Sequence, residues 1–308
     1  MGTEAVSGAV VKETLAGYVF EVEAYLRQCL RDKNIPCLLL TPMQYSLDAG
    51  GKKLRPVLCL VFAEMFGLSV ERSVPFASGL ELIHTYSLIH DDLPAMDNDD
   101  LRRGKPSNHK KFGEAKAILA GDGLLTEAFS LMLEPGGDIP AERLVRAAGF
   151  VARAAGPSGM VGGQVLDMAY TGVEGKEKGL VGLDELRNMH AMKTGALIRA
   201  ACVSGAVLAG AGTEDVDRAK EYGAAIGVAF QIVDDILDVV GDQAKLGKPV
   251  GSDQDKGKLT YPSLVGLEES AKLAREAVDT ALGALEPYTG KQADFLRGLA
   301  QYIIDRAN

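Results

Sequence analysis

Apolar residues along most of the chain recur three and four positions apart, which is the spacing of one face of an α-helix. The first segment, from about residue 4 to 33, shows this with Val11, Leu15, Val19, Val22 and Leu26. Strand-like alternation is hard to find, so the pattern predicts an all-α protein. Further segments of helical period follow at about 56–67, 75–91, 113–133, 141–155, 159–168, 183–208, 214–240, 262–285 and 291–306.

Glycine and proline separate these segments, as at the break around Pro135 between two predicted core helices. No linker, low-complexity run or fixed-period repeat separates one part of the 308 residues from another. The chain is therefore expected to form a single domain over residues 1–308, built as one large helical bundle.

Two clusters of aspartates interrupt the apolar pattern. The first lies in the stretch HTYSLIHDDLPAMDNDD (84–100), and the second lies in DDILDVVGD (234–242). A run of acids is normally solvated, but leucine, isoleucine and valine precede or interleave these acids, which indicates that the carboxylates line a cavity. Carboxylates crowded at a cavity wall lose hydration and repel one another. They therefore need cations, either lysine and arginine or a hard divalent metal.

Spacing within each cluster predicts which acids converge. Asp234 and Asp238 lie one helical turn apart and reach the same side of a helix. Asp91 and Asp97 are six residues apart, so an unbroken helix would turn them to different faces. Pro94 removes a backbone donor and is expected to end or distort that helix, which lets Asp97 return toward Asp91. Such oxygen ligands favour Mg²⁺, which keeps several waters and bridges to phosphates.

Cations accompany both clusters. The heptapeptide GGKKLRP (50–56) predicts a turn that opens a new helix and holds an anion with backbone amides and the helix dipole. Lys52 and Arg55 are the residues expected on a phosphate there, although solvated cations at a helix start are the alternative for this motif alone. Arg102 follows the first aspartates and suits bidentate phosphate contacts. Lys193 lies in a largely small and apolar helix, so it requires an anionic partner.

Composition narrows the partners. The formal net charge of −9 disfavours nucleic acid and anionic membrane surfaces. No stretch of about 20 apolar residues occurs, so stable membrane insertion is not expected. The four cysteines show no CxxC spacing, which argues against a zinc site or disulfide frame and favours a reducing cytoplasm. An anionic substrate must therefore be met by a local basic cluster or a metal.

A family resemblance rests on several motifs taken in order. GGKKLRP, DDLPAMDNDDLRRGKPS, MKTG, FQIVDDILDVVGD, LGK and KLTYP together resemble the short-chain trans-prenyltransferases, the farnesyl and geranylgeranyl diphosphate synthases, from about residue 20 onward. The resemblance implies an all-α bundle of the isoprenoid synthase type around a central active-site cavity, with one aspartate motif on each wall. It also implies a homodimer that condenses isopentenyl diphosphate with an allylic diphosphate, dimethylallyl or geranyl diphosphate.

The same resemblance implies roles for individual residues. The Mg²⁺ ligands, direct or through water, would be Asp91, Asp97, Asp234 and Asp238. The residues on the allylic diphosphate would be Arg102, Lys193, Lys248 and Lys258. The residues on isopentenyl diphosphate would be Lys52, Arg55, His84 and Arg103. Catalysis would fall to Lys193 and to the dipoles of Thr194 and Gln231, which face an allylic carbocation.

Product length would be set on the helix that precedes Asp91. In this family an aromatic residue five positions before the first aspartate, here Tyr86, is associated with the fifteen-carbon product, so farnesyl diphosphate is expected, with Ser87 on the same wall. Asn98 and KPSNHKKFGE also resemble geranylgeranyl-forming members and leave that product open. A non-catalytic regulatory subunit is a distant alternative, because every acid and base that the family uses is present.

Overall fold

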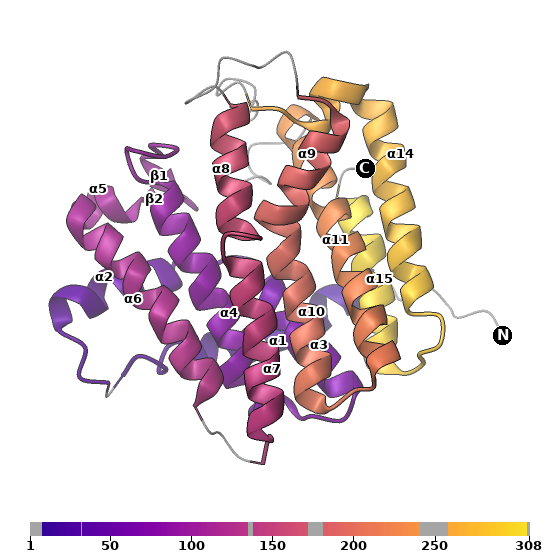
Figure 1. The fold of residues 1–308 in the computed structure, drawn as a ribbon, viewed down its shortest axis with the longest axis horizontal. Coiled ribbons are helices and arrows are strands. Elements are labelled where there is room, and N and C mark those ends of the chain that lie inside the picture. Colours follow the sequence, from indigo (N-terminus) through magenta and orange to yellow (C-terminus); the bar gives the residue numbers. More distant parts are fainter. Residues whose placement is uncertain (1–7, 32, 135–137, 172–180, 241–257, 307–308) are drawn as a thin grey trace.

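The computed structural model describes residues 8–31, 33–134, 138–171, 181–240 and 258–306. These residues are helical except for two strands of two residues each, which pair antiparallel, and the connecting loops. Figure 1 shows the helices gathered side by side into one bundle. The predicted all-α class is confirmed. Among the predicted site residues, Lys248 lies outside the described part of the chain.

The elements up to the middle of the chain are α1 (Gly8–Leu26), α2 (Cys37–Leu47), α3 (Leu54–Met65), α4 (Val70–Asp91), β1 (Leu101–Arg102), β2 (Lys105–Pro106), α5 (Asn108–Phe112), α6 (Glu114–Leu133) and α7 (Ala141–Ala155). Those that follow are α8 (Met160–Tyr170), α9 (Leu183–His190), the π-helical turn η1 (Ala191–Gly195), α10 (Ala196–Ala209), α11 (Thr213–Val240), α14 (Tyr261–Ala284) and α15 (Lys291–Asp305).

Most boundaries agree closely with the periodicity, but three helices differ from it. The first segment was expected to run to about residue 33, but its helix ends at Leu26. The helix expected from residue 75 begins at Val70, and Pro75 lies inside its second turn. The single helix expected over 183–208 is interrupted by η1, where the backbone widens into a π-helical turn. Apolar spacing does not reveal such a turn here, because α10 is apolar and buried nearly all round and has no apolar stripe whose phase the turn could shift.

Helix α10 lies at the centre of the bundle. It packs against α3, α11 and α7, and its residues are buried nearly all round, as expected for a helix in a protein interior. The stretch Leu183–Ala209 is long and apolar enough to cross a membrane, but 72% of its most apolar window is buried inside the protein. Buried apolar residues from α1 to α15 form one cluster, which is what a single domain requires.

The crossing of α10 and α3 depends on Gly205. A Cβ atom at this position would lie 2.2 Å from the Cys59 carbonyl oxygen and 2.9 Å from the Ala63 nitrogen. Both are backbone atoms, so relief requires moving a helix. We expect Gly205→Ala to lower the free energy of unfolding by about 2 kcal/mol, measured by urea denaturation.

Gly17→Ala is the matched control for this prediction. Gly17 is exposed inside α1, and a Cβ atom added there would meet nothing within 4 Å beyond its own helix. Alanine there should raise the free energy of unfolding by about 0.5–1 kcal/mol. Equal effects of the two substitutions would show that the helix crossing tolerates a methyl group.

Candidate active site

Both aspartate clusters line one polar chamber of about 370 Å³. Asp91 and Asp97 reach it from the end of α4 and the segment that follows, and Asp234 reaches it from the last turns of α11. The structure therefore brings together the two acidic clusters that the sequence separates. The cations around the same chamber are Lys52, Arg102, Lys193, Lys258 and Arg306.

A second chamber, of about 410 Å³, continues from the first. Leu88, Asp91, Lys193 and Thr194 line both, so the two spaces meet at these four residues. Beyond them the walls are mainly apolar and come from α4 and α8. The remaining lining residues are Arg55, His84, Tyr86, Ser87, His90, Met96, Met160, Val161, Gln164, Val165 and Met168. The site is thus a charged space that opens into an apolar one.

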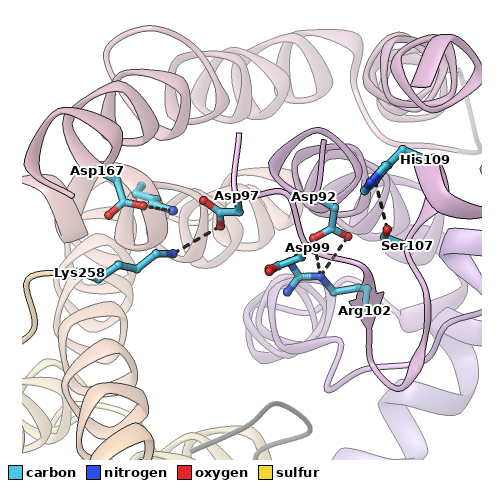
Figure 2. A network of polar contacts seen from close by, with 9 residues as sticks. Asp92, Asp97, Asp99, Arg102, Ser107, His109, Asp167 and Lys258 are labelled. Carbon is cyan, nitrogen blue, oxygen red and sulfur yellow. Dashed lines mark hydrogen bonds and ion pairs between the residues drawn. The ribbon is translucent and has the colours of Figure 1, made fainter. Parts of the chain in front are cut away.

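The backbone after α4 folds back as Pro94 predicted. Helix α4 ends at Asp91, and the amide of Asp97 donates to the carbonyl oxygen of Asp91 at 2.8 Å. The Asp97 carboxylate then accepts from the Lys258 ammonium at 3.4 Å. Figure 2 shows Asp97 turned toward Lys258, with Asp167 nearby. Lys258 therefore ties the first aspartate cluster to the segment that precedes α14.

Arg102 is held by an aspartate that sequence reasoning gave no role. Its Nε donates to both carboxylate oxygens of Asp92, at 3.0 and 3.2 Å, and its Nη2 also donates to Asp92. Asp99 lies 3.6 Å from the same guanidinium (Figure 2). Asp92 is buried, and burial raises the pKa of its carboxyl even though Arg102 opposes this shift. The second acid of the motif thus orients a cation instead of facing the chamber.

The π-helical turn η1 carries Lys193 and Thr194 into the junction of the two chambers. Lys193 Nζ lies 2.5 Å from Asp167 Oδ2 on α8, which supplies the anionic partner that a largely buried lysine needs. Gly163 permits this approach, since a Cβ atom there would lie 2.2 Å from the Lys193 backbone nitrogen. A π-helical turn shifts the side chains that follow it, and such turns often occur at functional sites.

Thr194 and Gln231 belong to one chain of hydrogen bonds. The Thr194 hydroxyl donates to Gln231 Oε1 at 3.0 Å, and Gln231 Nε2 donates to Asp235 Oδ1 at 2.8 Å. The Tyr261 amide donates to the other oxygen of Asp235 at 3.0 Å. Asp235, which lies between the two predicted ligands of its motif, therefore fixes the amide orientation of Gln231.

The second aspartate cluster is divided between the chamber and the interior. Asp234 lines the chamber and pairs with Arg306 at 3.2 Å. Asp238, predicted to reach the same side as Asp234, is only 2% exposed and is not among the described residues that line either chamber. Arg306 was missed because no motif spacing marks it. Its guanidinium and the Lys52 ammonium lie 5.7 and 5.2 Å from the centre of the Phe230 ring.

Positive charge predominates in a region near α3. The Arg55 Nε is buried and has no hydrogen-bond partner among the described residues. Burial lowers the pKa of Arg55 to about 10, so it remains charged at neutral pH. Burial is the largest effect that holds the pKa of His84 well below its usual range, and the positive charges of Arg55 and Arg103 lower it further. The ring is therefore neutral at neutral pH. Lys52, Arg55, His84 and Arg103 thus form a region suited to an anion.

Tyr86 and Ser87 form part of the apolar wall. Tyr86 is 7% exposed, and its ring packs edge-on against His90 with centroids 5.7 Å apart. The Ser87 hydroxyl donates back to the His84 carbonyl at 2.9 Å. Gln164 faces them from α8, with both amide atoms buried and without partners in the part of the chain that the structure describes. Depth of the apolar chamber is therefore set by α4 and α8 together.

Comparisons with known proteins agree with this geometry. A family model described as polyprenyl synthetase matches residues 36–294. A geranylgeranyl diphosphate synthase of Cyanophora paradoxa is 43% identical over 298 residues, covering 96% of this chain and 97% of that protein. A farnesyl diphosphate synthase of Bacillus subtilis (strain 168) is 50% identical over 236 residues, covering 76% of this chain and 78% of that protein. The crystal structure of a geranyltransferase from Legionella pneumophila has a TM-score of 0.85 at 34% identity, covering 98% of this chain and 99% of that chain.

Burial of the Asp91 carboxyl opposes its ionisation. Burial, with a smaller effect from Asp97, raises the pKa of Asp91 to about 6. Because this value exceeds that of an unfolded aspartate, the protonated form favours folding, and stability is lost as pH rises from about 4 through about 6. We expect Asp91→Asn to raise the free energy of unfolding by about 1–3 kcal/mol at pH 8, measured by urea denaturation.

Two comparisons control this prediction. The gain should shrink at pH 4, where Asp91 is protonated in the folded protein. Asp217→Asn, which removes an exposed carboxylate from α11, should change stability by no more than about 0.5 kcal/mol. A loss of stability in Asp91→Asn at pH 8 would show that the neighbouring cations need this charge more than burial penalises it.

Proposed function

Because this chain belongs to the polyprenyl synthetase family, a family of prenyltransferases, we propose that it condenses isopentenyl diphosphate with dimethylallyl and geranyl diphosphate. The observation that carries the proposal is the meeting of the charged and apolar chambers at Asp91, Lys193 and Thr194. An allylic diphosphate has an anionic head and a hydrocarbon tail. Its reactive carbon joins the two, and the junction is where such a carbon would lie.

The residues of the polar chamber fit Mg²⁺ as a cofactor. Asp91, Asp97 and Asp234 offer only oxygen donors, which suit a hard divalent cation. No three acid, histidine or cysteine side chains converge into a ready-made metal cage among the described residues. Mg²⁺ commonly shares its coordination between a few carboxylates, water and substrate phosphates, so open acids are what it requires. When bound, it supplies positive charge that stabilises the departing diphosphate.

The fixed cations around this chamber would bind the allylic diphosphate. Arg102, Lys193 and Lys258 already hold carboxylates, so a diphosphate replaces or joins anionic partners that are in place. Preorganised charge of this kind lowers the barrier to breaking the allylic C–O bond, because it faces negative charge that grows in the transition state. Lys248 is proposed for the same role from sequence resemblance alone.

The positive carbon left by C–O cleavage needs dipoles and no nucleophile. The Thr194 hydroxyl donates its proton to Gln231, so oxygen lone pairs of Thr194 stay available toward the junction. Gln231 is held by Asp235 and cannot turn freely. The apolar wall excludes water, which would otherwise capture the cation. We assign Lys193, Thr194 and Gln231 as the catalytic residues on this basis.

Isopentenyl diphosphate would occupy the cationic region near α3. Lys52, Arg55 and Arg103 supply positive charge there, and a buried guanidinium nitrogen that has no partner among the described residues fits an incoming phosphate oxygen. His84 is neutral, so it would donate a hydrogen bond without adding to the repulsion among these cations. Two anion-binding regions, one for each diphosphate, are what a condensation of two diphosphates requires.

We propose farnesyl diphosphate as the main product. The support is the position of Tyr86, whose mostly buried ring narrows the apolar chamber close to Asp91. Geranylgeranyl diphosphate is the second candidate, because the Cyanophora paradoxa relative carries that name and aligns over nearly its whole length. A regulatory subunit that lacks activity is disfavoured by the charged chamber itself, which a purely interacting protein has no reason to keep.

We also propose that the protein acts as a homodimer in the cytoplasm. Support for the dimer comes from large apolar side chains that are exposed on α6 and α7, where a second copy would cover them. These residues are Ile118, Leu119, Leu133 and Val145.

The function is tested by incubating the protein with Mg²⁺, isopentenyl diphosphate and each allylic diphosphate in turn, then sizing the products. We expect prenyl diphosphates longer than the allylic starter. Asp91→Ala and Asp234→Ala should each lower turnover by at least about 100-fold, by loss of a group that stabilises charge. Asp217→Ala, an exposed change on α11, should leave turnover unaltered. Near-normal turnover in either chamber variant would remove that residue from the proposed ligands.

Tyr86→Ala tests the assignment of product length. Removal of a ring that is 7% exposed should deepen the apolar chamber, so products should shift from fifteen toward twenty or more carbons. Tyr86→Phe keeps the ring and serves as the control, with an expected product distribution like that of the unaltered protein. Unchanged product lengths in Tyr86→Ala would place the limiting wall elsewhere, with α8 as the next candidate.

A further inference from the structure

A buried ion pair beside the Gly50–Lys52 turn has no place in the roles described above. Lys53 Nζ and Glu81 Oε1 lie 3.0 Å apart, and each side chain is 1% exposed. Lys53 immediately precedes α3, whereas Glu81 lies within α4, three residues before His84. The pair therefore joins the turn to the helix that carries the first aspartate cluster.

Lys53 also holds the backbone of the turn. Its ammonium donates to the carbonyl oxygens of Gly50, at 3.1 Å, and Leu47, at 3.4 Å. Lys53 has φ of 47°, a left-handed conformation that is unfavourable for a residue with a side chain. Contacts of its side chain must offset that cost. The Arg103 guanidinium donates to the same Gly50 carbonyl, so Lys53 and Arg103 fix the turn from two directions.

Glu81 supplies negative charge in a region where cations predominate. Burial lowers the pKa of Arg55 and of Arg103, and the strongest opposing effect at both is the Glu81 carboxylate. Three positive charges face this one buried acid, and they belong to Lys53, Arg55 and Arg103. The region therefore keeps a net positive charge for an anion, while Glu81 limits the repulsion that would otherwise push the cations apart.

We propose that Lys53 and Glu81 are positioning residues for isopentenyl diphosphate. They do not touch the substrate, but they hold the Gly50–Lys52 turn against α4 so that Lys52, Arg55 and Arg103 converge on one diphosphate. The inference rests on the proposed function. It predicts a selective effect, because Lys193 and Lys258, proposed for the allylic diphosphate, lie on other elements, and Arg102 is held by Asp92.

Glu81→Gln is the first test. We expect KM for isopentenyl diphosphate to rise about tenfold, equivalent to about 1.4 kcal/mol, while KM for geranyl diphosphate stays within about twofold. Glu81→Asp should recover part of the affinity, since it restores the charge at a shorter reach. A similar rise in both KM values, or no change in either, would overturn the proposal.

A double variant separates the positioning role from a general loss of folding, because it leaves no buried charge without a partner. Lys53→Met with Glu81→Leu replaces the ion pair by apolar side chains, a change that buried pairs often tolerate without loss of stability. It also removes the donor to Gly50 and Leu47, so a small fall in melting temperature is expected, and the selective rise in KM should persist. The matched control is Lys33→Met with Glu127→Leu, which removes a pair 2.6 Å apart that lines neither chamber. Both KM values should be unaltered in that control.

A binding measurement separates this inference from the proposed function. Inorganic diphosphate without magnesium should raise the melting temperature of the unaltered protein and raise it less in the Lys53/Glu81 double variant. If the unaltered protein makes no prenyl product, the proposed function fails, and the melting shift still decides whether the pair positions an anion site. If product forms normally and neither KM nor the shift changes in the variants, only the inference fails.

Discussion

Like charges that share a poorly hydrated space must be balanced, and this constraint organises the structure. Acids from α4, α8, α11 and the segment after α4 surround one chamber together with cations from five different segments, and Asp97, Asp167 and Asp234 each pair there with a cation. At short range and low effective dielectric such contacts are strong, whereas an uncompensated charge is costly. The long helices serve to bring these charged ends together from distant parts of the chain.

The sequence predicted much of this arrangement because the relevant physics is local. Helical periodicity located α6, α7 and α15 to within a residue or two, and Pro94 correctly indicated that Asp97 returns to Asp91. The need of a largely buried Lys193 for an anion was also confirmed, with Asp167 as that partner. Each of these inferences used only spacing or the cost of burying one charge.

What the sequence did not reveal depends on tertiary context. Periodicity fixes the relative phase of residues on a helix but not which side faces a cavity, so Asp238, expected beside Asp234, is buried, whereas Asp235, for which no role was predicted, lines the charged chamber. The π-helical turn leaves no mark on the apolar pattern. Arg306 reaches Asp234 only because α15 packs near α11, a contact between segments that no motif links.

The shared boundary of the two chambers divides the molecule into parts that selection can alter separately. Changes at Val161 or Met168 reshape the tail space without disturbing the charged groups at the other end. Related sequences can therefore differ in the size of their product while they keep the charged residues that activate the substrate. Substitution at these two positions of α8 therefore changes the apolar space alone, whereas substitution of one ionisable residue alters the charge balance of all its neighbours.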